Sequence, residues 1–301
     1  MSTIARVAVV VVSYETRDAL LACLRALRDH GGVPVELVVV DNASTDGSAR
    51  AVRDRHPEAL VIANPDNAGF GRACNQGWRA TRAPLVLFLN PDAEVGPGAL
   101  ATLAAVLESR PEVAAAGPRT RSADGAIQVS TGPDLGWLAE ARQRRLVRGV
   151  ARRQPGALAE AEARHAVEHE PDWVSGACLI ARRSALEAVS GFDERFFLYE
   201  EDADLCRRLR AAGGRIVFTP RAEVRHRLGS SMARAPERAR LEYHRSHLVY
   251  YGKHNGALSA AFLAALLAAR GALGWLQASL SGDPARGRES AELLALALGR
   301  R

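Results

Sequence analysis

An acidic cluster carries the residue types best suited to proton transfer. Four acids lie within residues 200–204, directly after the apolar Phe196–Tyr199 segment. Like charges this close raise one another's pKa, so a partly desolvated member could take a proton from a substrate. The alternative is the acidic first turn of a helix, which the helix dipole favours. In such a helix Asp202 and Asp204 diverge by about 200°, so we expect Asp204 to pair instead with Arg207 or Arg208.

A second candidate site follows the apolar run at residues 85–89. Five consecutive apolar residues predict a strand buried on both faces, and Pro91 should end it. Asn90, Asp92 and Glu94 then lie at the carboxyl end of a strand, where open α/β sheets bind ligands. A carboxylate there could hold a divalent metal and phosphates. A solvated turn is the alternative interpretation.

Asp41 ends another apolar run in the same way and could reach a ribose or a base edge, although a helix cap is the alternative. The turn after the first run is Ser-Tyr-Glu-Thr, residues 13–16, without G-x-G-x-x-G or a Walker lysine. The sequence therefore argues against a hydride-transfer enzyme and a P-loop NTPase.

These residues need a parallel sheet to bring them together. Buried strands are expected at 7–12, 36–41, 60–63 and 85–89, with helices at 18–30, around 51–52 and at 72–81 between them. This alternation predicts an α/β doubly wound, mostly parallel sheet. Further on we expect helices at 99–107 and 184–189, strands at 113–116, 178–180 and 216–218, and a connector at 222–226.

Composition is that of a globular protein: 301 residues, 48% hydrophobic and 25% charged. The net charge of +6 comes from arginines and suits phosphorylated ligands or an anionic membrane, but is too diffuse to argue for nucleic acid. Four distant cysteines resemble reduced core residues, and the run at 7–12 is too short for a signal peptide. We therefore expect a cytoplasmic protein.

Two segments could touch a membrane. An arginine-rich stretch at 132–153 could form a basic amphipathic helix, although a solvated helix face is commoner. The apolar residues 257–269 are expected to form a buried or surface-lying helix that stops at Arg270 and is too short to span a bilayer. Peripheral contact with the inner face of an anionic membrane is therefore an open alternative.

Together these pieces resemble the family-2 glycosyltransferases with a GT-A fold, specifically the bacterial rhamnosyltransferase-like branch. The resemblance covers about residues 7–231 and rests on the strings VVVVSYETRDALLACLRAL, ELVVVDNASTDGS, NAGFGRACNQG, LFLNPDAEV, WVSGACLIARRSALEAVSGFDERFFLYEEDADLCRRLR and EVRHRLGSS. It implies a GT-A domain at 1–231, with a nucleotide-binding half at 1–118 and an acceptor and catalytic half at 119–231. Residues 232–301 are then a helical extension.

The resemblance also implies roles for individual residues. Those that it implies along the donor are Ser13, Tyr14, Glu15, Asp41, Asn67, Gly69 and Asn90. Asp92 and His226 would hold Mg²⁺ or Mn²⁺, and Ser175 and Gly176 would line the sugar and acceptor pocket. Asp202 corresponds to the general base, with Glu201 beside it.

The implied activity is an inverting transfer of one sugar from a nucleotide-diphosphate donor, dTDP-L-rhamnose first and a UDP-sugar second. The acceptor would be a hydroxyl of a cell-surface polysaccharide or lipid-linked saccharide. Asn90 replaces the first acid of the family's Asp-x-Asp pair, so we expect a weakly held metal. There is no Gln-x-x-Arg-Trp motif, which argues against a processive synthase.

Two other classes of protein remain as alternatives. A sugar-nucleotide pyrophosphorylase should have a Gly-rich loop with Arg or Lys after the first strand, which residues 13–17 do not form. A non-catalytic sugar-nucleotide-binding protein should have lost Asp202 or Asp92, and both are present.

Overall fold

The computed structural model describes residues 7–227 and 236–299. They form two compact units, one from residues 7–194 and 201–227 and the other from 195–200 and 236–299. The expected boundary at 231/232 and the end of the EVRHRLGSS string lie outside the described residues.

The first half of the larger unit alternates strands and helices as predicted. Its elements are β1 (Val7–Ser13), α1 (Arg17–His30), β2 (Val35–Asp41), α2 (Ser48–Arg55), β3 (Leu60–Ala63), α3 (Phe70–Arg79) and β4 (Leu85–Leu89). β1 pairs in parallel with both β2 and β4, and β2 with β3. The carboxyl ends of these strands therefore meet at one edge of the sheet.

The second half extends the sheet with strands of both directions. Its strands are β5 (Ala93–Val95), β6 (Val113–Arg121), β7 (Ile127–Gln128), β8 (Thr131–Gly132), β9 (Trp173–Val174), β10 (Cys178–Arg182) and β11 (Arg215–His226). Its helices are α4 (Ala99–Ser109), α5 (Trp137–Ala151), α6 (Pro155–Arg164), α7 (Arg183–Ala188) and α8 (Glu201–Ala211). The main sheet has the order β3-β2-β1-β4-β10-β6-β11-β5, and β7 pairs with β6. The expected mostly parallel α/β fold is confirmed, with β10 antiparallel to both of its neighbours.

The connector expected at 222–226 was wrong, because these residues form the end of β11. The strand has an irregularity between Thr219 and Glu223 and then resumes pairing with β6, while its last three residues pair with β5.

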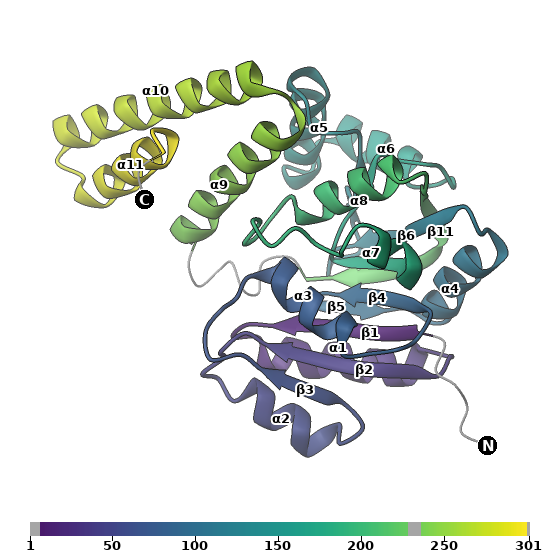
Figure 1. The fold of residues 1–301 in the computed structure, drawn as a ribbon. Coiled ribbons are helices and arrows are strands. Elements are labelled where there is room, and N and C mark those ends of the chain that lie inside the picture. Colours follow the sequence, from purple (N-terminus) through teal and green to yellow (C-terminus); the bar gives the residue numbers. More distant parts are fainter. Residues whose placement is uncertain (1–6, 228–235, 300–301) are drawn as a thin grey trace. The chain divides into compact units, whose positions relative to one another are not determined.

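Alternate residues of the strands face two separate cores. Val7, Val9 and Val11 pack with side chains of α1 and α4 on one face of the sheet. Ala8, Val10 and Val12 pack on the other face with side chains of α3 and α8 (Figure 1). Burial on both faces explains the continuous apolar runs in these strands.

The smaller unit is helical, with α9 (Pro236–His254), α10 (Ala257–Ser281) and α11 (Pro284–Ala297). The expectation that the helix stops near Ala269 was wrong: α10 continues through Arg270, which is exposed to solvent, for 25 residues. Gly282 follows α10 with a left-handed backbone conformation, and the Asp283 side chain then caps α11 by accepting from the Arg286 N–H.

Candidate active site

Antiparallel pairing at the sheet edge brings His226 beside Asp92. His226 is opposite Ala93 in the β5–β11 pair, and the Arg227 N–H donates to the Asp92 carbonyl at 2.9 Å. His226 Nε2 then lies 3.1 Å from Asp92 Oδ1 and 3.3 Å from Asn90 Nδ2. The His226 and Asp92 side chains are both buried. Two residues far apart in sequence thus form one cluster, while Glu94 pairs with Arg227.

Gln128 fixes the orientation of the His226 ring. Its Nε2 donates to the His226 carbonyl at 2.7 Å, so its Oε1, 3.1 Å from His226 Nδ1, must accept a proton from that nitrogen. With the proton on Nδ1, the Nε2 lone pair of a neutral ring is directed toward Asp92. Sequence reasoning missed Gln128, which lies on the two-residue strand β7 with no local pattern around it.

Asp92 and His226 fit a divalent ion. A carboxylate oxygen and an imidazole nitrogen held this close are donors that Mn²⁺ accepts, and a second hydrogen bond to the histidine is typical of metal sites. Among residues 7–227 and 236–299 there is no group of three or more His, Cys, Asp or Glu that could hold a metal. Two protein donors therefore leave most coordination positions to other ligands, such as diphosphate oxygens.

Asp202 lies on the first turn of α8, and both of its carboxylate oxygens accept backbone N–H groups. Oδ2 accepts from Gly176 and Oδ1 from Ala203, each at 2.8 Å. Burial raises the pKa of Asp202 above its ordinary value, and these hydrogen bonds lower it in part. The carboxylate is therefore a stronger proton acceptor than an ordinary aspartate and is fixed in direction.

The segment Ser175–Ala177 connects Asp202 to the cluster of Asp92 and His226. The Gly176 N–H holds Asp202, and the Ala177 carbonyl next to it accepts the Asn90 N–H at 2.9 Å. The Ser175 hydroxyl turns back to accept the Ala177 N–H at 3.3 Å. A single tripeptide thus sets the positions of Asp202 and of the turn that carries Asp92.

The other acids of the cluster are also buried. Asp204 is fully buried, and its Oδ2 accepts from Arg208 Nε at 2.7 Å, as expected from their spacing. Arg208 also donates to the carbonyls of Val189 and Gly191, so this pair anchors α8. Glu201 is buried at the first residue of α8.

Asp41 has the free acceptor expected of a nucleotide contact. Its Oδ2 accepts the Ser44 N–H at 3.1 Å, while the buried Oδ1 has no hydrogen-bond partner among the described residues. Ser13 shares a 3.1 Å hydrogen bond with Thr16, and Tyr14 is 38% exposed. An unsatisfied buried carboxylate oxygen is costly unless a ligand donates to it.

Several residues expected along the donor instead make hydrogen bonds to other residues of the protein. Glu15 Oε1 accepts from the Thr45 N–H at 2.6 Å and the Thr45 hydroxyl at 2.9 Å, which joins the loops after β1 and β2. Asn67 Oδ1 accepts the N–H of Gly69 at 3.1 Å, and the Gly69 carbonyl accepts from Asn42, which sequence reasoning did not single out. These bonds shape the loops at the strand ends.

A cavity of about 310 Å³ lies next to the cluster. Ile127, Val129 and Val150 contribute apolar walls, and Ser175 and His226 also line it. Of the two residues that the resemblance assigns to the sugar and acceptor pocket, Ser175 lines this cavity and Gly176 does not. An apolar cavity that reaches the His226 side chain could accept an apolar ligand.

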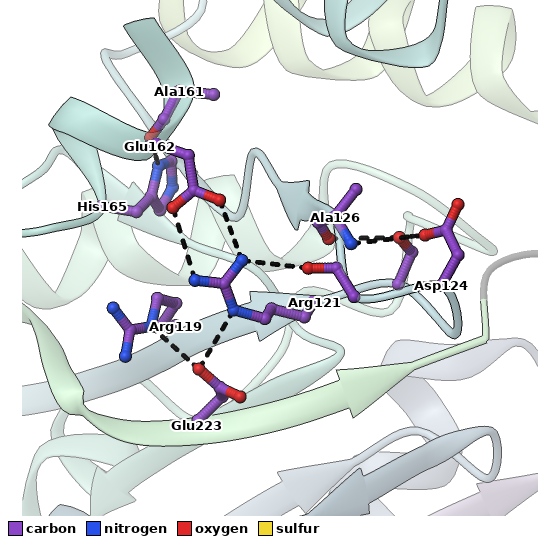
Figure 2. A network of polar contacts seen from close by, with 10 residues as sticks. Arg119, Arg121, Asp124, Ala126, Ala161, Glu162, His165 and Glu223 are labelled. Atoms are coloured by element: carbon purple, nitrogen blue, oxygen red, sulfur yellow. Dashed lines mark hydrogen bonds and ion pairs between the residues drawn. The ribbon is translucent and has the colours of Figure 1, made fainter. Parts of the chain in front are cut away.

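Figure 2 shows a network of ion pairs and hydrogen bonds around Arg121. Arg121 at the end of β6 donates to Glu162 of α6 at 2.8 Å, to Glu223 of β11 at 3.2 Å and to the Gly125 carbonyl at 3.0 Å. The hydrogen bond to Glu162 is the main reason that the pKa of Arg121 is raised. The network joins α6, β11 and the turn before β7, and so supports Gln128.

The doubly wound sheet, with the Asp41, Asp92 and Asp202 carboxylates held at one edge, has the architecture of a GT-A fold. Residues 5–242 match the family described as "Glycosyltransferase like family 2", and the chain belongs to this family. It is therefore a glycosyltransferase.

Similar proteins agree with this assignment. The chain is 33% identical over 261 residues to N-acetylglucosaminyl-diphospho-decaprenol L-rhamnosyltransferase of Mycobacterium tuberculosis, covering 82% of this chain and 85% of the relative. It is 29% identical over 253 residues to an O-antigen biosynthesis protein of Myxococcus xanthus, covering 81% of this chain and 19% of that protein. In fold it is similar to a mannosyltransferase from Pyrobaculum calidifontis in complex with GDP-Man and Mn²⁺, with a TM-score of 0.60, 20% identity, and coverage of 99% of this chain and 87% of that one.

Proposed function

We propose that this glycosyltransferase transfers a single L-rhamnosyl residue from dTDP-L-rhamnose to a hydroxyl of a lipid-linked saccharide, with inversion at the anomeric carbon. The choice of sugar and acceptor is supported by the rhamnosyltransferase of Mycobacterium tuberculosis, whose name specifies a diphospho-decaprenol acceptor and which aligns with 82% of this chain. A UDP-sugar is the second donor to test.

The observation that carries the proposal is the pair of hydrogen bonds made by residues 176 and 177. Gly176 orients the Asp202 carboxylate, and Ala177 bonds the Asn90 turn that leads to Asp92. A base and a phosphate-binding edge are thereby fixed by adjacent peptide groups. This arrangement supports a single displacement, in which base and leaving group act in one step.

In the proposed step Asp202 takes the proton of the acceptor hydroxyl while that oxygen bonds to the anomeric carbon. The bond from the anomeric carbon to the diphosphate oxygen breaks on the opposite face, and dTDP leaves with the electron pair. The raised pKa of Asp202 favours proton transfer to it. One displacement of this kind inverts the configuration.

Asp92 and His226 would hold the divalent ion, and Gln128 would keep His226 in the tautomer that can bind it. The bound ion would offset the negative charge that develops on the leaving diphosphate. Asp41 would accept an N–H of the nucleotide base through its unpartnered Oδ1.

The cavity beside Ser175 and His226 is the proposed site for the acceptor. Its walls are apolar, which suits the less polar faces of a saccharide or the start of a polyprenyl chain. Its contact with His226 would bring the acceptor to the edge at which the donor diphosphate binds.

A donor screen tests this function. The thermal unfolding of the purified protein is measured with Mg²⁺ or Mn²⁺ and with dTDP-, UDP- and GDP-sugars in turn. In a separate assay, unheated enzyme is given each stabilising donor and a polyprenyl-diphosphate saccharide, and sugar transfer is measured. A donor present at a hundred times its Kd should add about 2.7 kcal/mol of stability. The proposal expects stabilisation and transfer with dTDP-L-rhamnose, whereas transfer from a UDP-sugar alone would replace the donor assignment.

A further inference from the structure

The long helix α10 exposes a row of large apolar side chains along one side. Its most hydrophobic window has a mean hydropathy of 1.7 and is only 17% buried. Six of the seven exposed large apolar residues of α10 lie along one side, called here the apolar stripe: Leu258, Phe262, Leu266, Leu273, Leu276 and Leu280. The seventh, Trp275, lies about 140° from the centre of the stripe. Leu258 is 88% exposed and Leu280 is 81% exposed, so both ends of the stripe are open to solvent.

The apolar stripe is a single continuous face. At 100° per residue its six members fall within a sector of about 80°. The buried Leu263, Leu267 and Ala278 fall on roughly the opposite side. Large apolar side chains on one aligned face, in contrast to scattered ones, mark a surface that binds a partner.

The side of α10 that contacts α11 is built from small residues. A Cβ at Gly271 would lie 2.8 Å from the Leu294 nitrogen, and one at Gly274 would lie 2.5 Å from Ser290 Oγ. The two helices therefore approach with backbone contact at these glycines, while the large side chains of the apolar stripe stay exposed and Leu263 and Leu267 are buried. Small residues at a helix contact are common where helices meet in lipid.

The charge of the helical unit identifies the kind of partner. Residues 232–301 contain ten arginines and lysines but five aspartates and glutamates, so they carry most of the chain's net charge of +6. A second copy docked through the apolar stripe would bring two positive units together, which is unfavourable. An anionic bilayer complements both the charge and the apolar face.

We propose that the apolar stripe of α10 docks this enzyme on an anionic membrane, with the helix lying in the plane of the interface. α10 is about 37 Å long, which is enough to span a bilayer. A spanning orientation, however, would place Arg270 near the bilayer centre and would also bury α11, with Arg288 and Glu292, in the hydrocarbon. In the interfacial orientation Arg270 lies at the flank of the stripe, about 80° from its centre, where it can reach the head groups.

The inference goes beyond the proposed function, because membrane binding is measured without donor or acceptor. The probes are vesicles of phosphatidylcholine with and without phosphatidylglycerol. The stripe variant combines Leu273→Glu and Leu280→Glu. The control combines Leu60→Glu and Val167→Glu, which are exposed apolar residues of the larger unit outside the 132–153 segment and give the same change in net charge.

Wild type should sediment with phosphatidylglycerol vesicles and bind phosphatidylcholine vesicles less. The stripe variant should lose about tenfold in partitioning, while the control variant should keep most of it, and circular dichroism should show all three proteins folded. Equal partitioning of wild type and stripe variant would overturn the proposal. The proposal would also be overturned if the wild type were a dimer that binds neither kind of vesicle and the stripe variant were a monomer. That result would assign the apolar stripe to contact with a second copy of the chain.

Discussion

Asp202→Asn should remove the proposed general base while leaving donor binding intact. The asparagine keeps the shape of the side chain and one oxygen that can accept the Gly176 N–H, but it cannot take a proton at neutral pH. Loss of a positioned base costs roughly 10² to 10⁴ in turnover, which corresponds to about 3–5 kcal/mol of barrier. The Kd of dTDP should barely change, because Asp41 and the proposed metal ligands are unaltered. Steady-state kinetics and calorimetric titration of dTDP measure the two quantities.

The pH dependence gives an independent test of the same residue. Burial raises the pKa of Asp202 above 3.8 in the folded protein. The acidic limb of kcat/KM in the wild type should therefore lie above pH 3.8, and the residual activity of Asp202→Asn should lack that limb. Because ionisation of Asp202 is less favourable in the folded state, the wild type should lose stability relative to the variant as pH rises from 3.8 through the folded pKa.

Wild-type turnover in Asp202→Asn would refute this assignment. If Glu201→Gln instead abolished turnover with the fold intact, the base would lie one residue earlier. A difference in unfolding free energy between wild type and Asp202→Asn that does not vary with pH would contradict the raised pKa.

Three further predictions follow from the site. Gln128→Leu removes the acceptor for His226 Nδ1 and should lower the affinity for Mn²⁺, so that the Mn²⁺ concentration giving half-maximal activity rises by about 10- to 100-fold. An unchanged concentration would contradict the assigned orientation of the His226 ring. Asp41→Asn should raise the Kd of dTDP by roughly 10- to 100-fold, as expected for one hydrogen bond to a charged group, whereas Glu15→Gln should leave this Kd near wild type; equal effects would refute the distinction. Asp204→Asn should lower the free energy of unfolding by about 3 kcal/mol but kcat by less than about tenfold, and the reverse pattern in denaturation and rate measurements would make Asp204 part of the chemistry.

The first four strands could be predicted because buried parallel strands are nearly continuous apolar runs. The end of β11, beyond Thr219, was harder to predict. Buried Ala222, Val224 and His226 alternate there with exposed residues, which is the pattern of a strand with one buried face. The pattern was missed because it is short and follows Pro220, and because the partner strand β5 has only three residues.

The acids at strand ends could be predicted because chain order and sheet topology together determine where they lie. Gln128 could not, since its contact with His226 joins residues 98 positions apart and depends on a two-residue strand. Arg270 was misread as a helix end because charge alone does not stop a helix; arginine has good helix propensity, and an exposed position costs it no desolvation.

The most direct test of the proposed reaction is the anomeric configuration of its product. Purified enzyme with Mn²⁺, dTDP-L-rhamnose and a polyprenyl-diphosphate saccharide is allowed to react, and the new linkage is assigned by nuclear magnetic resonance. We predict one rhamnosyl residue per acceptor, with the configuration opposite to that of the donor, and a product that Asp202→Asn forms at least about a hundredfold more slowly. Retention of the donor's configuration, or equal rates with Asp202→Asn, would contradict a single displacement assisted by this base.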